Sequence, residues 1–220
     1  MSGVNLVTFM NQRSFGEPAP TVIGQAYGGG FWTGNISTTA DSVATHYLVV
    51  APVSSGQSTK QWKNANTTTT GAKSVINGPQ NTADMVAEGN STVYPAAHFC
   101  NDLVIGAFTD WYMPAKNELE VCYRNLKPGT ASNDTSSGIN ANAVPARASN
   151  YTAGNPAQTS AAAFQTGGAE AFSVSGPANY WSSTEDSFLS GMGTYFPSGN
   201  QTSFGKSYSY RTRAIRRVAV

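Results

Sequence analysis

Two tryptophan-centred segments most strongly constrain the fold that this chain of 220 residues can adopt. The first, residues 110–119 (DWYMPAKNEL), leads into a helix that starts after Pro114 and ends before Pro128. The second, residues 180–185 (YWSSTE), opens a β-rich tail that ends in an arginine-rich segment at 211–217. The apolar residues of the helix recur at i, i+3, i+4 and i+7, namely Leu119, Cys122, Tyr123 and Leu126. A helical part therefore precedes a β-rich part.

Shorter patterns predict the remaining elements. The clearest strand is residues 46–51, a β-branched run that we expect to form a hairpin with the stretch 21–32 across the polar turn 37–41. The other predicted strands are 61–63, 192–196, 201–204 and 208–218, the last of them central in its sheet. The other predicted helices are 82–88, 95–103 and a short one at 161–164.

A long loop rich in Ser, Asn, Ala and Gly occupies residues 129–158. Its only apolar anchors are Ile139, Val144 and Tyr151. Loops of this length in compact domains are functional or disordered. We treat residues 1–20, which include Gly16, Pro18 and Pro20 and show no sustained periodicity, as an arm for attachment or oligomerisation. Residues 21–220 then form one domain.

Charge is scarce, since only 11% of the residues are Asp, Glu, Lys or Arg and the net charge is +1. An average soluble domain has roughly 25% charged residues. A near-neutral surface gives no field that would attract nucleic acid or an anionic membrane, so we expect neither partner. The arginines at 211–217 lack interleaved lysines, which makes a nucleic-acid patch a weak reading. The N-terminus has no signal-peptide pattern, and no apolar run approaches membrane-spanning length.

Two cysteines, Cys100 and Cys122, lie on two successive predicted helices. A disulfide is one reading, but for a protein made in a cytosol we favour two buried thiols. They form no Cys-x-x-Cys pair and have no His/Cys cluster around them, so the sequence predicts no metal site. It also predicts no cofactor, because no phosphate-binding loop is present.

The tryptophans and the charged residues in and near the two segments could have a structural role or a functional one. Trp111 and Trp181 could stack on a ligand, but we favour core positions with hydrogen-bonded indole N–H groups. Buried charges need partners, so the acids and bases are read as ion pairs rather than as a catalytic carboxylate pair. The predicted framework comprises Asp110, Trp111, Glu118, Trp181, Glu185, Arg213 and Arg216, with Arg217 in the same basic cluster.

The sequence predicts no catalytic residues. His46 and His98 stand alone, and no nucleophile elbow or Ser/His/Asp order accompanies them. A glycan hydrolase that uses Asp110 or Glu185 is the minor enzymatic alternative. We therefore expect a protein that is not an enzyme.

Residues 186–210 have the composition of an adaptable binding surface. Rigid aromatic rings alternate there with Ser, Gly, Asn and Thr, a combination found in recognition loops. Because strand residues alternate between faces, we expect either Tyr195 or Phe196 to point inward and the other outward. The predicted ligand-binding residues are Asp186, Phe188, Met192, Tyr195, Asn200, Phe204, Tyr208 and Tyr210.

The segments 110–126, 180–185 and 210–217, together with 23–31 and 47–52, resemble a known family. It comprises the C-type-lectin-like domains of phage tail-fibre tips and of a bacterial collagen-like adhesin, related to the variable proteins of diversity-generating retroelements. The resemblance implies an α+β fold with two main helices on a twisted antiparallel sheet and long irregular loops. In some relatives the positions between the second tryptophan block and the last strand are randomised, which here corresponds to residues 186–210.

Three departures qualify the resemblance. Ala115 stands where such domains often carry a capping Ser, so the helix start should lose about 1 kcal/mol. The calcium-site tripeptides of sugar-binding animal lectins are absent. The cysteine of the related formylglycine-generating enzymes has no counterpart either.

The resemblance implies a virion protein, made in the host cytoplasm, that binds a bacterial surface receptor, either a glycan or an outer-membrane protein. Residues 1–20 would contact other virion proteins, and we expect a homo-oligomer, with a trimer favoured. The alternative is a decoration or adaptor protein of the capsid or tail that binds no receptor.

Overall fold

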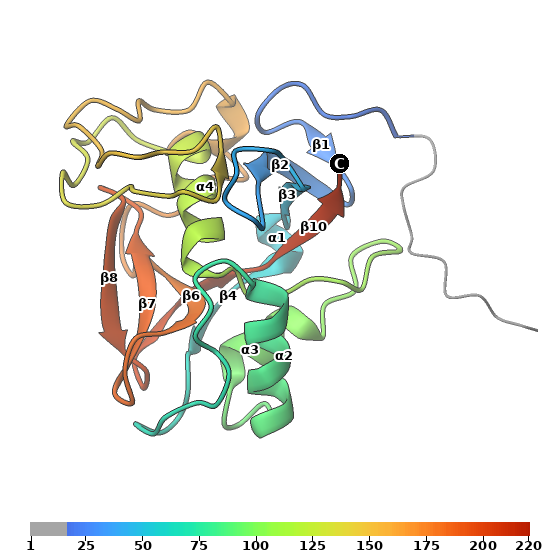
Figure 1. The fold of residues 1–220 in the computed structure, drawn as a ribbon, viewed down its shortest axis with the longest axis vertical. Helices are drawn as coiled ribbons and strands as arrows, with labels where there is room; N and C mark the ends of the chain where they lie inside the picture. The colour runs from blue at the N-terminus through green and yellow to red at the C-terminus, as the bar shows by residue number, and fades with distance from the viewer. Residues whose placement is uncertain (1–16) are drawn as a thin grey trace, which may run out of the picture.

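A computed structural model describes residues 17–220. These residues form a mixed α+β fold with four α-helices and two curled, mostly antiparallel sheets of five strands each (Figure 1). The predicted arm at residues 1–20 lies largely outside the described residues. The predicted α+β class is confirmed at this level.

The first sheet brings together strands from both ends of the described chain. Its order is β1 (Ala26–Tyr27), β2 (Gly30–Ile36), β3 (His46–Val50) and β10 (Ile215–Ala219), with β5 (Ala143–Val144) pairing on β2. The predicted hairpin between β2 and β3 is confirmed. Residues 21–25 are not a strand, because the Gln25 side chain accepts the Thr21 N–H and Gly24 turns the backbone at φ +81°.

The second sheet has the order β4 (Gln57–Gln61), β9 (Ser209–Arg213), β6 (Asn179–Glu185), β7 (Ser190–Tyr195) and β8 (Asn200–Gly205). The predicted hairpin around 197–200 is confirmed as β7 and β8. The short strand predicted at 61–63 lies earlier, and Trp62 follows its end.

A single central strand over 208–218 is wrong. The chain leaves the second sheet after Arg213 and enters the first at Ile215, where β10 ends the strand order. Ala214 makes the change of sheet, since its N–H donates to Gly56 O and its carbonyl accepts from Ala51 N, both at 2.9 Å. Periodicity cannot reveal this change because the strand-forming residues run on without a break.

The helices are α1 (Val53–Gly56), α2 (Gly78–Glu88), α3 (Pro95–Asn101) and α4 (Lys116–Leu126), with a 3-10 turn η1 at Ala162–Phe164. Helix α2 begins four residues earlier than predicted because the Asn77 side chain accepts the Gln80 N–H at its start. Helix α4 contacts β2 of the first sheet and β6 and β7 of the second. It therefore fills the space between the sheets (Figure 1).

The start of α4 replaces its missing cap by a contact from another element. Ala115 has no side-chain acceptor, but Glu118 Oε2 still accepts the Ala115 N–H at 2.8 Å. Thr184 Oγ1 of β6 accepts the Lys116 N–H at 3.0 Å. The cap predicted to be lost is thus supplied in part by the second tryptophan segment.

Buried side chains form two clusters. One surrounds α4 and the other contains Trp62, Trp111 and Trp181. Both cysteines are buried free thiols, as favoured from the sequence, and burial raises the pKa of each to about 12.

The long loop at 129–158 is ordered by polar side chains rather than by the apolar anchors alone. Tyr151 is buried as predicted, but Ile139 is 56% exposed. Asn133 and Asn140 are buried instead, and each bonds several groups of the loop and of α4. A sequence reading that weighs only apolar residues overlooks such anchors.

Candidate binding site

Both tryptophans of the marker segments belong to the core, as favoured from the sequence. Trp111 is 2% exposed and Trp181 is fully buried. The indole N–H of Trp181 donates to Lys60 O at 3.0 Å, whereas that of Trp111 has no partner within the described residues. Neither ring is therefore a ligand platform by itself.

The predicted ion pairs form, although some partners differ from the expected ones. Arg216 donates from Nε and Nη2 to both oxygens of Asp110, at 2.7 and 2.8 Å. Arg213 pairs at 2.8 Å with Glu170, an acid that the sequence analysis did not single out. These arginines tie the C-terminal strands to distant loops.

Glu118 is the most constrained acid of the framework. Its Oε1 accepts from Tyr112 OH and from Arg217 Nε, and its Oε2 accepts the N–H groups of Gly78 and Ala115. Burial raises the pKa of Glu118 above its usual value, although Arg217 opposes the shift. Because both of its oxygens accept hydrogen bonds, this carboxylate has a structural role and connects α4 to α2 and β10.

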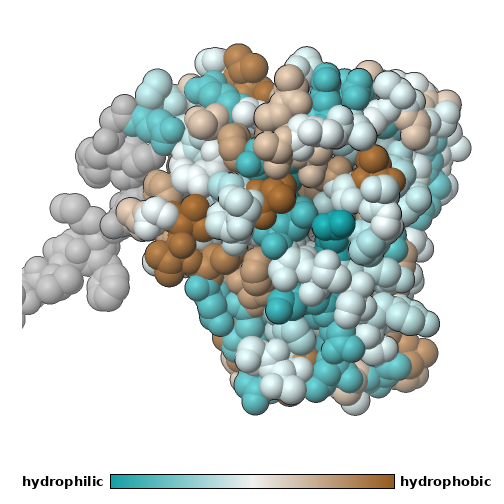
Figure 2. All heavy atoms as spheres, turned by 180° about the vertical axis from the view of Figure 1, so that it is seen from behind, coloured by the Kyte–Doolittle hydropathy of each residue, from teal (hydrophilic) through white to brown (hydrophobic). Residues whose placement is uncertain are grey.

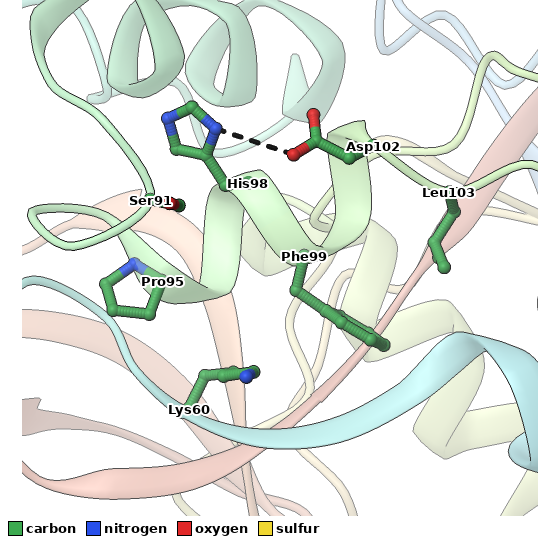
Figure 3. Close-up of a pocket in the computed structure, with 7 residues that line it drawn as sticks. All are labelled: Lys60, Ser91, Pro95, His98, Phe99, Asp102 and Leu103. Atoms are coloured by element: carbon green, nitrogen blue, oxygen red, sulfur yellow. Dashed lines mark ion pairs between the residues drawn. The ribbon is translucent and has the colours of Figure 1, made fainter.

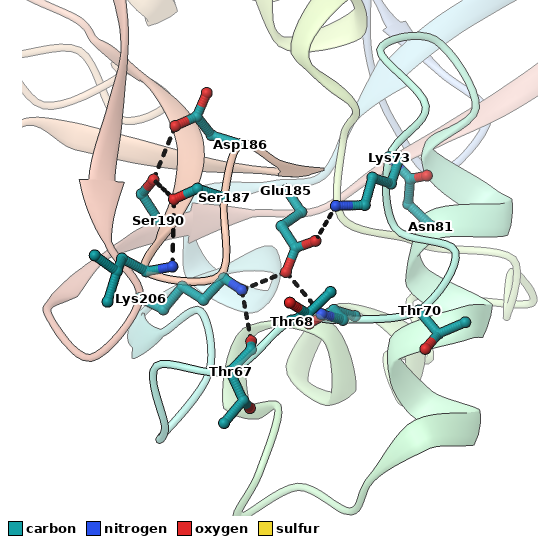
Figure 4. Close-up of polar contacts among 12 residues, drawn as sticks. Thr67, Thr68, Thr70, Lys73, Asn81, Glu185, Asp186, Ser187, Ser190 and Lys206 are labelled. Carbon is teal, nitrogen blue, oxygen red and sulfur yellow. Dashed lines mark hydrogen bonds and ion pairs between the residues drawn. The ribbon is translucent and has the colours of Figure 1, made fainter.

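Glu185 joins the second sheet to the loop that follows β4 (Figure 4). Its buried carboxylate accepts from Lys206, from Lys73 at 2.6 Å and from the Thr69 N–H at 2.7 Å. Burial acts to raise the pKa of Glu185, but the two ammonium groups outweigh it and hold the pKa below its usual value. The lysines are partners that sequence reasoning missed, and Lys206 was discoverable as a lone charge among residues 187–209.

Exposed rings gather in one segment. Among the described residues, the aromatic side chains that are more than a third exposed are Phe188 (55%), Tyr195 (41%) and Tyr208 (62%). All three lie within residues 186–210. Phe196 is fully buried and stacks on Phe172 at 4.0 Å, whereas Tyr195 is exposed. This confirms the prediction that one of the two points inward and the other outward, and it assigns the inward position to Phe196.

Half-buried rings link this surface to the core. Phe204 and Tyr210 lie against Trp181, with ring centroids 5.9 and 5.2 Å away, and Tyr208 lies 6.0 Å from Tyr210. Gly193 leaves room for Phe204, since a Cβ there would lie 3.0 Å from that ring. We call Trp181, Phe204, Tyr208 and Tyr210 the aromatic cluster.

The predicted binding residues do not form one patch. Phe204, Tyr208 and Tyr210 come together, while Tyr195 and Asn200 face each other at the opposite end of the β7–β8 hairpin. Asn200 also donates to Asp134 at 2.7 Å.

The remaining predicted residues occupy a turn and a half-buried position. Asp186 accepts from Ser190 at 2.8 Å within the β6–β7 turn (Figure 4). Phe188 belongs to the same turn. Met192 is only partly exposed on β7. The strands therefore divide the predicted segment into separate surfaces.

No family model, curated protein or solved structure matches this chain. Within residues 17–220, no three His, Cys, Asp or Glu side chains are grouped so that they could hold a metal ion. None of the helices in the same range is long and apolar enough to cross a membrane.

Proposed function

We propose that this protein is a receptor-binding virion protein with a C-type-lectin-like fold, which attaches to a bacterial surface through residues 186–210. The observation that carries the proposal is the location of the exposed rings. Phe188, Tyr195 and Tyr208 all lie in the segment that the family resemblance marks as variable.

The fold proposal draws support from the way the marker segments assemble. Trp111 and Trp181 share one core cluster, and Arg216 of the final strand pairs with Asp110 of the first block. Strand β10 pairs along its whole length with β3, so the C-terminal strand lies beside an N-terminal hairpin. A compact frame of this kind can present a loop-rich face.

The chemistry of the hairpin supports recognition without charge. Residues 187–205 contain no Asp, Glu, Lys or Arg, and rings there alternate with hydroxyl and amide side chains. Figure 2 shows a mostly polar surface on the face it views, with apolar residues in separate groups. Such a surface offers stacking and hydrogen bonds to a glycan or a protein loop, and many copies on a particle would add avidity.

The first test is adsorption of fluorescently labelled protein, presented on multivalent beads, to a panel of bacterial strains. The proposal predicts saturable binding to a subset of strains. Absence of binding to every strain would instead favour the decoration or adaptor role. Scrambling residues 186–210 is unsuitable as a control, because the segment forms β7 and β8 of the fold.

A further inference from the structure

A hollow of about 450 Å³ lies between α3 and β4, on the molecule's surface (Figure 3). Its volume falls in the range of small-ligand sites. The lining residues are Lys60, Ser91, Pro95, His98, Phe99, Asp102 and Leu103. Sequence reasoning found none of them as a site, because Lys60 lies on β4 and the others lie within residues 91–103.

Lys60 brings an unused positive charge to this pocket. Its side chain makes no ion pair or hydrogen bond with any residue from 17 to 220. Lys63, Lys73 and Lys206 are all paired with carboxylates. In a chain so poor in charge, a free ammonium in a pocket is available for an anionic group of a ligand.

The rest of the lining supplies an apolar wall and an acceptor. Figure 3 shows Phe99 on α3 and Leu103 on the segment after it pointing toward the side where Lys60 lies, with His98 and Asp102 on the other flank of the helix. The Asp102 side chain is 63% exposed, with His98 Nδ1 at 3.7 Å. A carboxylate at the rim accepts hydrogen bonds from hydroxyls and disfavours a ligand of high negative charge.

We propose that this pocket binds an acidic sugar, whose carboxylate pairs with Lys60, whose ring packs on Phe99 and whose hydroxyls donate to Asp102. This inference rests on the proposed receptor binding and names the receptor as an acidic glycan. Lys60 lies directly across the β4–β9 ladder from Tyr210, so the pocket adjoins the aromatic cluster. A glycan chain seated in the pocket can thus continue over Tyr210.

The test is a titration of isotope-labelled protein with sodium glucuronate, followed by amide chemical shifts, with glucose and sodium acetate as comparison ligands. Glucuronate should shift resonances around Lys60 and Phe99 and bind more tightly than either comparison ligand. Lys60→Ala should weaken glucuronate binding about tenfold, the loss of one charged hydrogen bond. Lys116→Ala is the matched control, since Lys116 is also half-exposed and its side chain has no partner within the described residues.

Equal responses to glucuronate and acetate, no response to glucuronate, or unchanged binding by Lys60→Ala would each overturn the acidic-sugar site. These failures are distinct from failure of the proposed function. Protein that adsorbs to bacteria but ignores glucuronate would retain receptor binding and lose only the pocket.

Discussion

Aromatic rings have opposite roles at two places in the second sheet. Trp181 is fully buried, Phe204 and Tyr210 beside it are half-buried, and the neighbouring charges are paired, as at Glu185 with Lys206. Phe188 in the β6–β7 turn, Tyr195 at the end of β7 and Tyr208 just before β9 are instead exposed to solvent. The same residue types thus build a frame or a surface according to their position along the strands.

This difference between buried and exposed rings indicates which residues can be substituted without loss of stability. Removing a buried ring leaves a cavity, and removing one member of a buried ion pair leaves a charge without a partner. Removing an exposed ring does neither. We call the buried rings and ion pairs, such as Trp181 and Glu185 with Lys206, the frame. If the surface binds a receptor, substitutions in the frame should change stability, and substitutions of the exposed rings should change adsorption to bacteria.

The largest effect is expected for Trp181→Ala. Trp181 is fully buried, packs against Phe204 and Tyr210, and donates its indole N–H to Lys60 O. Its loss should lower the free energy of unfolding by about 3–5 kcal/mol. Urea unfolding followed by circular dichroism measures this, and a loss below about 1 kcal/mol would contradict the frame assigned to this ring.

Glu185→Gln should cost about 3 kcal/mol because it leaves the buried Lys206 without a carboxylate. The pKa of Glu185 is lowered by folding, so its contribution is present above the unfolded carboxyl pKa of about 4.3 and is lost as the pH falls through the lower folded pKa. The unfolding free energy of the variant should therefore lack this part of the acid dependence. Urea titrations between pH 3 and pH 7 compare the two proteins, and parallel profiles would contradict the assignment.

Thr184→Val tests the contact that replaces the helix cap. The variant keeps the shape of the side chain but loses the acceptor for the Lys116 N–H, together with the hydroxyl that donates to Ser74 O at 2.9 Å. We expect a loss of about 1 kcal/mol in the free energy of unfolding. The converse variant, Ala115→Ser, is the comparison: a gain as large as a full cap would indicate that Thr184 contributes little.

Tyr208→Ser should have the smallest effect on stability. The ring is 62% exposed, and its centroid lies 6.0 Å from that of Tyr210. Its replacement should change the free energy of unfolding by no more than about 0.5 kcal/mol. A larger loss in thermal unfolding would place Tyr208 in the frame.

Sequence reasoning recovered the elements whose signals are local. Helix α4 and the β7–β8 hairpin follow from periodicity and turn residues. Alternation predicts that Tyr195 and Phe196 lie on opposite faces, but it does not say which of them is buried. The change of sheet at Ala214 was missed because it depends on contacts with Gly56 and Ala51, far away in the chain.

The candidate sites show the same limit. Composition singles out the segment 186–210 as a candidate, but it does not predict the division of that segment into separate surfaces, which follows from strand register. The pocket beside Lys60 could not be predicted from the sequence. Neither Lys60 nor Phe99 belongs to a recognisable motif, and the two residues come together through the packing of α3 on β4. Polar anchors such as Asn133 were overlooked for the same reason.

The most direct test of the account compares two triple variants in the adsorption assay. One replaces Phe188, Tyr195 and Tyr208 by Ser, and the matched control replaces Val22, Val43 and Ile139, which are 63%, 64% and 56% exposed elsewhere on the surface. The account predicts that both fold normally and that only the aromatic variant loses binding to bacteria. Adsorption that survives in the aromatic variant, or falls equally in both, would contradict it.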